Sequence, residues 1–285
     1  MKNEPELHLA FARAVREACE ADVAAFKPGN VSLDAPGHGM QAEQFLASAA
    51  AISVPISAPH QTVGARILAA IEATRQVVST NTNLGIVLLA APLLQAAWQR
   101  GANESLQPAL ERVLEQLTLT DAQLAYRAIR LAQPGGLGTV AHHDISATPT
   151  VTLLEAMRES AERDAIALQY VSGYRLVLEL GLACIERTLA RGMSQQWAMV
   201  ACYLAILARV PDSLIVRKHG YRVAREVSLQ AAPFMQALEE NQEPQLLLPR
   251  LQAWDRELKA KSINPGTSAD LAVAALLAFK LLALA

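Results

Sequence analysis

Two apolar stretches place the strongest constraint on the fold of this chain. Residues 84–99 and 194–209 carry apolar side chains nearly all the way round a helix instead of along one stripe. A helix without a polar face belongs at the centre of a large bundle or at an interface between subunits. The sequence therefore predicts a bundle with buried central helices, and a homo-oligomer is compatible with the same pattern.

Helical spacing of apolar residues recurs along the rest of the chain, and strand-like alternation is almost absent. Ala and Leu, which are strong helix formers, are abundant, while aromatic residues make up only 5%, so the helices should pack closely through small side chains. We predict an all-α fold in which one domain, residues 1–285, forms a single large bundle of about a dozen helices. The expected helices span residues 6–25, 41–53, 61–79, 84–99, 106–117, 121–132, 150–171, 173–191, 194–209, 215–228, 231–239, 244–260 and 268–284.

Charge and cysteine usage exclude several classes of protein. The 25 basic and 27 acidic residues are interspersed, without the basic footprint of a nucleic-acid-binding protein. Residues 84–97 and 271–285 are shorter than the ~18–20 apolar residues of a membrane span, and the acidic N-terminus does not resemble a secretory signal. Three cysteines without a CxxC pair predict buried thiols: Cys19, Cys184 and Cys202. We expect a cytoplasmic protein with no nucleic-acid or membrane partner.

Residues 27–32, Lys-Pro-Gly-Asn-Val-Ser, end the first expected helix with more hydrogen-bonding groups than a terminator needs. One interpretation is a plain terminator with an exposed lysine. The other is an anion cradle, in which Gly29 lets the backbone approach a phosphate, Lys27 supplies charge, and Asn30 or Ser32 donates a hydrogen bond. Because Lys27 lies in a turn, we expect its replacement to cost little stability.

Two other helix starts are unusually polar. Residues 79–83, Ser-Thr-Asn-Thr-Asn, precede the uncharged helix 84–99 and exceed what capping requires. The first turn of a buried helix presents free N–H groups, which form a natural anion site. Residues 264–270, Asn-Pro-Gly-Thr-Ser-Ala-Asp, have the same design, although Thr267 and Asp270 also fit a capping box.

Further polar groups leave their chemistry open. His142, His143 and Asp144 could ligate a metal ion if another ligand joins them. Asp212, followed by Arg217 and Lys218, could clamp phosphates or form a surface ion-pair patch. The chain has no Walker A loop, dinucleotide-binding glycine motif, nucleophile elbow or HExxH pair. These residues favour phosphate and nucleotide binding between helices but do not name a reaction.

The order of the motifs along the chain indicates which reaction these residues serve. In sequence order they are Lys-Pro-Gly at 27–29, Gly-His-Gly-Met at 37–40, Phe-Leu-Ala-Ser at 45–48, Asn-Thr-Asn-Leu-Gly at 81–85, Asp-Ser with Arg and Gly at 212–220, and the segment 264–270. This series resembles the triphosphoribosyl-dephospho-CoA synthase family over nearly the whole chain. Enzymes of that family make the prosthetic-group precursor of citrate lyase and malonate decarboxylase.

The resemblance implies an all-helical transferase that uses ATP and 3′-dephospho-CoA. The acceptor ribose 2′-hydroxyl attacks the anomeric carbon of the ATP ribose, adenine leaves, and the triphosphate stays on the product. Such a transfer needs a base for the hydroxyl, a proton or hydrogen bond for adenine, and a triphosphate that is held still. A carboxylate-bound Mg²⁺ would help to hold it.

The motifs and the resemblance together give a set of candidate site residues. The expected catalytic acids are Asp144, Asp164 and Asp212, and two of them, Asp144 and Asp164, are also candidate metal ligands. The expected ATP and phosphate contacts are Lys27, Gly29, Asn30, Ser32, His38, Asn81, Thr82, Asn83, Arg217, Lys218, Gly266, Ser268 and Asp270.

The sequence departs from the family pattern at two places. The family usually has His and then Lys after its Asn-Thr pair, where this chain has Asn83 and Leu84, and the usual His-x-Asp-Met is reduced to His-Gly-Met at 38–40. Two alternatives therefore stand beside the synthase: a related nucleotide-dependent enzyme of one-carbon cofactor biosynthesis (methanopterin or methanofuran), or a non-catalytic nucleotide-binding helical protein.

Overall fold

The computed structural model describes residues 3–101, 103–135, 145–240 and 243–284. Within these residues the chain forms fourteen α-helices and one π-helical segment, and no strand. The predicted all-α class is therefore confirmed. In chain order the elements are α1 (Glu4–Ala24), α2 (Ala42–Ser57), α3 (Val63–Val77), α4 (Leu84–Gln99), α5 (Leu106–Glu115), α6 (Leu119–Ala132), α7 (Leu153–Ser160), α8 (Ala165–Ser172), η1 (Leu176–Leu182), α9 (Ala183–Ala190), α10 (Gln195–Arg209), α11 (Ser213–His219), α12 (Tyr221–Glu239), α13 (Pro244–Ala260) and α14 (Gly266–Leu282).

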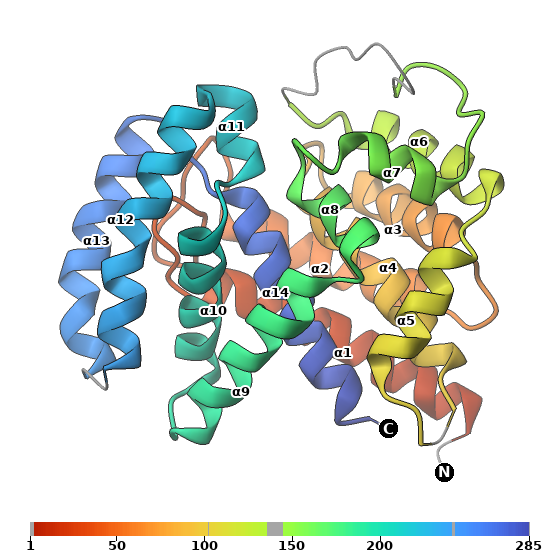
Figure 1. Ribbon diagram of the computed structural model, residues 1–285, viewed down its shortest axis with the longest axis horizontal. Helices are drawn as coiled ribbons and strands as arrows, with labels where there is room; N and C mark the ends of the chain where they lie inside the picture. The colour runs from red at the N-terminus through yellow and green to blue at the C-terminus, as the bar shows by residue number, and fades with distance from the viewer. Residues whose placement is uncertain (1–2, 102, 136–144, 241–242, 285) are drawn as a thin grey trace.

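The helices without a polar face lie in the interior, as predicted. In Figure 1, α14 runs through the middle of the molecule, with α10–α13 on one side and α3–α8 on the other. It packs against α1, α4, α10 and η1, and most residues of α4 and α10 are buried. The three cysteines are free and buried, as expected.

Two expected helices are divided differently in the structure. The stretch 150–171 breaks after α7, and Asp164 caps a separate helix α8. The predicted break between residues 228 and 231 is wrong, since Pro233 lies inside α12. The chain breaks at Gly220 instead, whose φ of 86° is a left-handed conformation that glycine adopts without strain.

Among the described residues, no single helix is long and apolar enough to cross a membrane. Taken together, α10 and α11 meet the criteria of length and composition, but they are bent by 54° at the break between them.

Buried tyrosines stabilise the central helix α4 at its proline. Pro92 has no N–H, so the carbonyl of Leu88, four residues earlier, lacks its regular helical donor. The hydroxyl of Tyr170 donates to that carbonyl at 2.6 Å. The hydroxyl of Tyr174 donates to the next carbonyl, Leu89, at 3.1 Å. The first of these bonds therefore satisfies an acceptor that would otherwise be buried and unpaired.

We expect Tyr170→Phe to destabilise the protein by about 1–3 kcal/mol, the usual cost of a buried unsatisfied group. Chemical denaturation measures this cost. Tyr174→Phe, the matched control, should cost less, because the regular donor for Leu89 is the N–H of Leu93, which is present. In a Pro92→Ala background the N–H at residue 92 is restored, so Tyr170→Phe should be milder there. An equal cost in both backgrounds would contradict this explanation.

Candidate active site

A cavity of about 740 Å³ lies where several helices begin. Its volume is within the usual range of about 300–1,000 Å³ for small-molecule sites. First-turn residues of α4, α8 and α14 line it, among them Gly85, Ile166 and Thr267. Helix starts carry partial positive charge and free N–H groups. The fold thus brings backbone donors from distant segments of the chain to one cavity.

Most of the predicted site residues meet at this cavity. Those in its lining are Asn30, His38, Asn81, Thr82, Asn83, Asp164, Arg217, Lys218, Gly266 and Asp270. Those that do not form part of the lining are Lys27, Gly29, Ser32, Asp212 and Ser268. Asp144 lies outside the described residues, as do His142 and His143.

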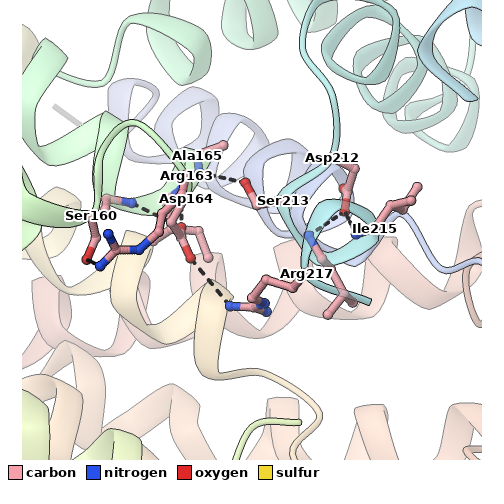
Figure 2. A network of polar contacts seen from close by, with 11 residues as sticks. Ser160, Arg163, Asp164, Ala165, Asp212, Ser213, Ile215 and Arg217 are labelled. Atoms are coloured by element: carbon pink, nitrogen blue, oxygen red, sulfur yellow. Dashed lines mark hydrogen bonds and ion pairs between the residues drawn. The ribbon is translucent and has the colours of Figure 1, made fainter. Parts of the chain in front are cut away.

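Asp164 links two walls of the cavity. Its Oδ1 atom caps α8 by accepting hydrogen bonds from the N–H groups of Ile166 at 2.8 Å and Ala167 at 3.3 Å. Its Oδ2 atom faces the guanidinium of Arg217 on α11 at 3.5 Å. Figure 2 shows this contact, together with the hydrogen bond from the N–H of Ala165 to the Ser213 hydroxyl at 2.7 Å. One oxygen of Asp164 is therefore fixed by the backbone, and in the described part of the chain the other has just a long ion pair.

Asp212 is buried and its carboxylate is fully used by the protein. Oδ1 accepts from the N–H groups of Leu214 and Ile215, at 2.9 and 3.2 Å. Oδ2 accepts from the N–H and the hydroxyl of Ser268, at 2.7 and 2.8 Å. Burial raises the pKa of this carboxyl, and the four donors oppose the rise. Asp212 and Ser268 therefore connect the starts of α11 and α14, and their polar atoms are used by the protein and not by a ligand.

Asp270 occupies a different environment. The capping-box interpretation of Thr267 and Asp270 is wrong, because α14 begins after Pro265 without any side-chain cap. The Asp270 carboxyl instead lies against Gly85, where a Cβ atom would clash with it. Burial raises its pKa well above the ordinary value, as do the carboxyls of Asp22 and Asp212. No described residue gives Asp270 a hydrogen bond or an ion pair.

Lys27 is not an exposed turn residue. Its ammonium group is fully buried and lies 3.2 Å from Oδ1 of Asp22, and it donates to the backbone carbonyls of Asp22 and Ala25. Asp22, on α1, contributes to the cavity wall. Burial raises the pKa of Asp22, and the charge of Lys27 opposes that rise. The lysine therefore acts on the cavity through the carboxylate that it holds.

The rest of the segment 27–40 is held by its backbone. Asp255 accepts from the N–H of Gly29 at 2.8 Å, and His38 contacts the Gly29 carbonyl at 2.8 Å. Gly29 has a φ of 80°, and a Cβ there would lie 2.8 Å from Pro265. Ser32 is buried, with no partner for its hydroxyl among the described residues. Burial lowers the pKa of His38, which favours its neutral form.

Polar residues at 79–83 serve both the helix and the cavity. The amide oxygen of Asn81 accepts from the N–H of Leu84 at 3.1 Å. Thr82 shares a hydrogen bond of 2.6 Å with Ser48. Asn83 exchanges hydrogen bonds with Thr74, its amide nitrogen donating at 3.0 Å. These contacts hold the side chains in place along the cavity wall.

Sequence reasoning missed several groups that line the cavity: Asp22, Arg75, Arg163 and Asn264. Asn264 belongs to the polar motif at residues 264–270, and its amide oxygen accepts a hydrogen bond from the Asn30 side chain at 3.0 Å. Asp22 had a local signal, since it is the one charged residue in the run 21–26 of an otherwise apolar helix end. Arg75 and Arg163 have no such local signal in the sequence, because each lies among other charged or polar residues.

Comparison with known proteins identifies the family of the chain. Residues 9–285 match the model of the family described as ATP:dephospho-CoA triphosphoribosyl transferase (CitG). The chain therefore belongs to this family of transferases. A crystal structure from Archaeoglobus fulgidus, provisionally named triphosphoribosyl-dephospho-CoA synthase, shares the fold with a TM-score of 0.62. The two chains are 23% identical over 82% of this chain and 97% of the other. No curated protein matches.

The packing of Asp270 on Gly85 predicts that replacing this glycine by alanine destabilises the protein, the opposite of the usual effect in a helix. Gly→Ala inside a helix usually stabilises by about 1 kcal/mol. Gly85→Ala should instead lower the melting temperature, because the new methyl group displaces the Asp270 carboxyl. In an Asp270→Ala background the clash with the carboxyl is removed and only the flexible end of the Ile166 side chain stays close, so the same substitution should be clearly less destabilising. A stabilising Gly85→Ala in the unaltered chain would show that the carboxyl moves away freely.

The burial of Lys27 reverses the expectation that its loss costs little. Lys27→Ala leaves Asp22 as a buried unpaired carboxylate, and breaking such a pair typically costs about 3–5 kcal/mol. Denaturant titration should show this loss. Lys280→Ala is the matched control, since Lys280 pairs with Glu17 at the surface, where pairs contribute at most about 1 kcal/mol. Similar small losses for both lysines would contradict the structural role given to Lys27.

Proposed function

We propose that the cavity binds ATP and transfers its ribosyl-triphosphate to the hydroxyl of a nucleotide-like acceptor, releasing adenine. Family membership supports 3′-dephospho-CoA as that acceptor. The observation that carries the proposal is the joining, in one cavity, of carboxyl groups for proton transfer with cations for a phosphate chain. Asp22, Asp164 and Asp270 supply the carboxyls, and the cations are Arg75, Arg163, Arg217 and Lys218.

The cations and helix starts can hold the triphosphate without cleaving it. Arg163 and Lys218 are exposed and can reach phosphate oxygens at the open side of the cavity. Among the described residues, the 3.5 Å contact with Asp164 is the one that holds the Arg217 guanidinium, so a phosphate can replace that partner. Arginine binds phosphate through parallel N–H groups, and this geometry also orients the chain.

Asp164 is the carboxylate that we assign as the base. Once Arg217 turns to the phosphate chain, Oδ2 of Asp164 is free to accept the proton of the acceptor hydroxyl, while Oδ1 stays fixed by the helix cap. Rigid placement of this kind favours the near-attack geometry on which transfer depends. Apolar residues of the lining, Leu84, Leu153, Met157 and Ile166, offer surface for the purine.

Mg²⁺ remains part of the proposal through ATP. The described residues contain no group of three or more His, Cys, Asp or Glu side chains arranged to hold a metal ion. Mg²⁺ bound to a nucleotide commonly keeps phosphate and water ligands, so the ion can enter the cavity on the triphosphate. When bound, it would neutralise part of the triphosphate charge. A cytoplasmic location and a homo-oligomeric state also remain predictions.

The alternatives differ in the acceptor or in the absence of chemistry. An enzyme of one-carbon cofactor biosynthesis would use the same ATP site with a different acceptor. A non-catalytic nucleotide-binding protein would not need carboxyls such as Asp164 and Asp270 facing the cavity, and their presence favours an enzyme.

Purified protein with Mg-ATP and 3′-dephospho-CoA should release adenine, and neither phosphate nor pyrophosphate. Asp164→Asn keeps a side-chain oxygen for the helix cap but loses the base, so turnover should fall by about 10²–10⁴. Chromatographic detection of adenine measures the turnover of the wild-type protein and of the variant. Glu226→Gln, an exposed site outside the cavity lining, is the control and should remain active. Phosphate release coupled to the acceptor, with adenine retained, would overturn the assignment.

A further inference from the structure

We propose that Asp270 is the acid that gives its proton to the departing adenine. This role rests on the proposed function and goes beyond it, since neither the family match nor the motif of residues 264–270 assigns a proton donor.

The argument begins with how the three acids of the cavity lining are held. Asp22 is paired with Lys27 at 3.2 Å. Asp164 accepts two backbone N–H groups and faces Arg217. Asp270 is the member of this set that has neither a hydrogen bond nor an ion pair within the described part of the chain. A carboxyl group without donors or a counter-ion is the one most easily kept as the neutral acid.

The surroundings of Asp270 are acidic and apolar. The charged groups that face it are Asp22 from α1, Asp164 at the start of α8, and Asp212 and Arg217 at α11. Helix α4, which lies against its carboxyl, contains no charged residue. Burial first, and then the three neighbouring carboxyls, raise the pKa of Asp270 well above its ordinary value, while Arg217 opposes this. The group therefore stays protonated at a pH where an exposed aspartate is ionised.

The position of Asp270 suits a purine leaving group. Its carboxyl lies at Gly85, beside which the side chain of Ile166 also packs, 2.9 Å from the position that a Cβ would take. Both residues belong to the cavity lining. A flat base placed against Leu84 and Ile166 would present its ring nitrogens to Asp270. Glycine at residue 85 is what allows the carboxyl to come this close to the first turn of α4.

The step balances without any further reactant. The bond from N9 of adenine to the anomeric carbon breaks, and its electron pair stays on the purine. The Asp270 proton moves to a purine ring nitrogen, so adenine departs as a neutral molecule. The acceptor oxygen bonds to the anomeric carbon and gives its proton to Asp164. Both aspartates then return to their starting states by exchanging protons with water.

Leaving-group rescue tests this role. Asp270→Asn keeps the shape but cannot transfer a proton, so release of adenine from ATP should fall by about 10²–10⁴. In 7-methyl-ATP the base is already cationic and leaves without protonation. With this substrate the variant should stay close to the wild-type rate. An equal loss with both substrates would overturn the acid role, whereas a wild-type protein that releases base from neither substrate would overturn the proposed function, and the acid role with it.

A second measurement does not depend on turnover. A carboxyl whose pKa is raised on folding binds its proton more tightly in the folded state, so stability falls as pH rises above about 4, the ordinary aspartate value. Asp270→Asn removes this effect. The melting temperature of the variant should therefore rise relative to wild type between pH 4 and neutral pH, as expected from linkage. Asp34→Asn, at an exposed site outside the cavity lining, is the control. A difference for Asp270→Asn that does not change with pH would show that Asp270 is ionised in the folded protein, and this would overturn the proposal.

Discussion

The bridge made by Asp212 is the interaction on which the candidate site depends. One buried carboxylate accepts four hydrogen bonds, two from the start of α11 and two from Ser268 at the start of α14. A helix start buried in an apolar core needs partners for its N–H groups, and Asp212 supplies them for both helices at once. As a result, Arg217 on α11 and Asp270 on α14 keep a fixed relation across the cavity.

The aspartates near the cavity separate into structural and reactive groups by how many donors each receives. Asp212 receives four and has none of its surface in the cavity lining. Asp164 uses one oxygen for a helix cap and keeps the other for a replaceable arginine. Asp270 receives none from the described residues. Since each added donor favours the ionised form, the same residue type can serve as a joint, a base and an acid within one site.

The sequence was sufficient for the fold class and for ten residues of the cavity lining, and it failed where long-range contacts decide a role. The apolar pattern of α4 and α10 predicted their burial, because a helix without a polar face has few stable positions. Polar turns at 79–83 and 264–270 identified two helix starts that meet at the cavity. Nothing local shows that Lys27 turns inward to Asp22, or that Ser268 serves Asp212, since both depend on which helix ends meet in space.

The departures at residues 83 and 84 have a consequence for where phosphate charge can be held. Asn83 is bound to Thr74, and Leu84 offers apolar surface where the family usually carries a lysine. This wall therefore contributes backbone N–H groups and no side-chain charge. The positive charge that a triphosphate requires is available from Arg163, Arg217 and Lys218, on the segments around α8 and α11, and from Arg75 on α3. The cavity lining keeps these four cations, so the departures at residues 83 and 84 do not argue against nucleotide binding. We expect them to shift the phosphate chain towards α8 and α11, which would leave the apolar start of α4 as the surface for the base.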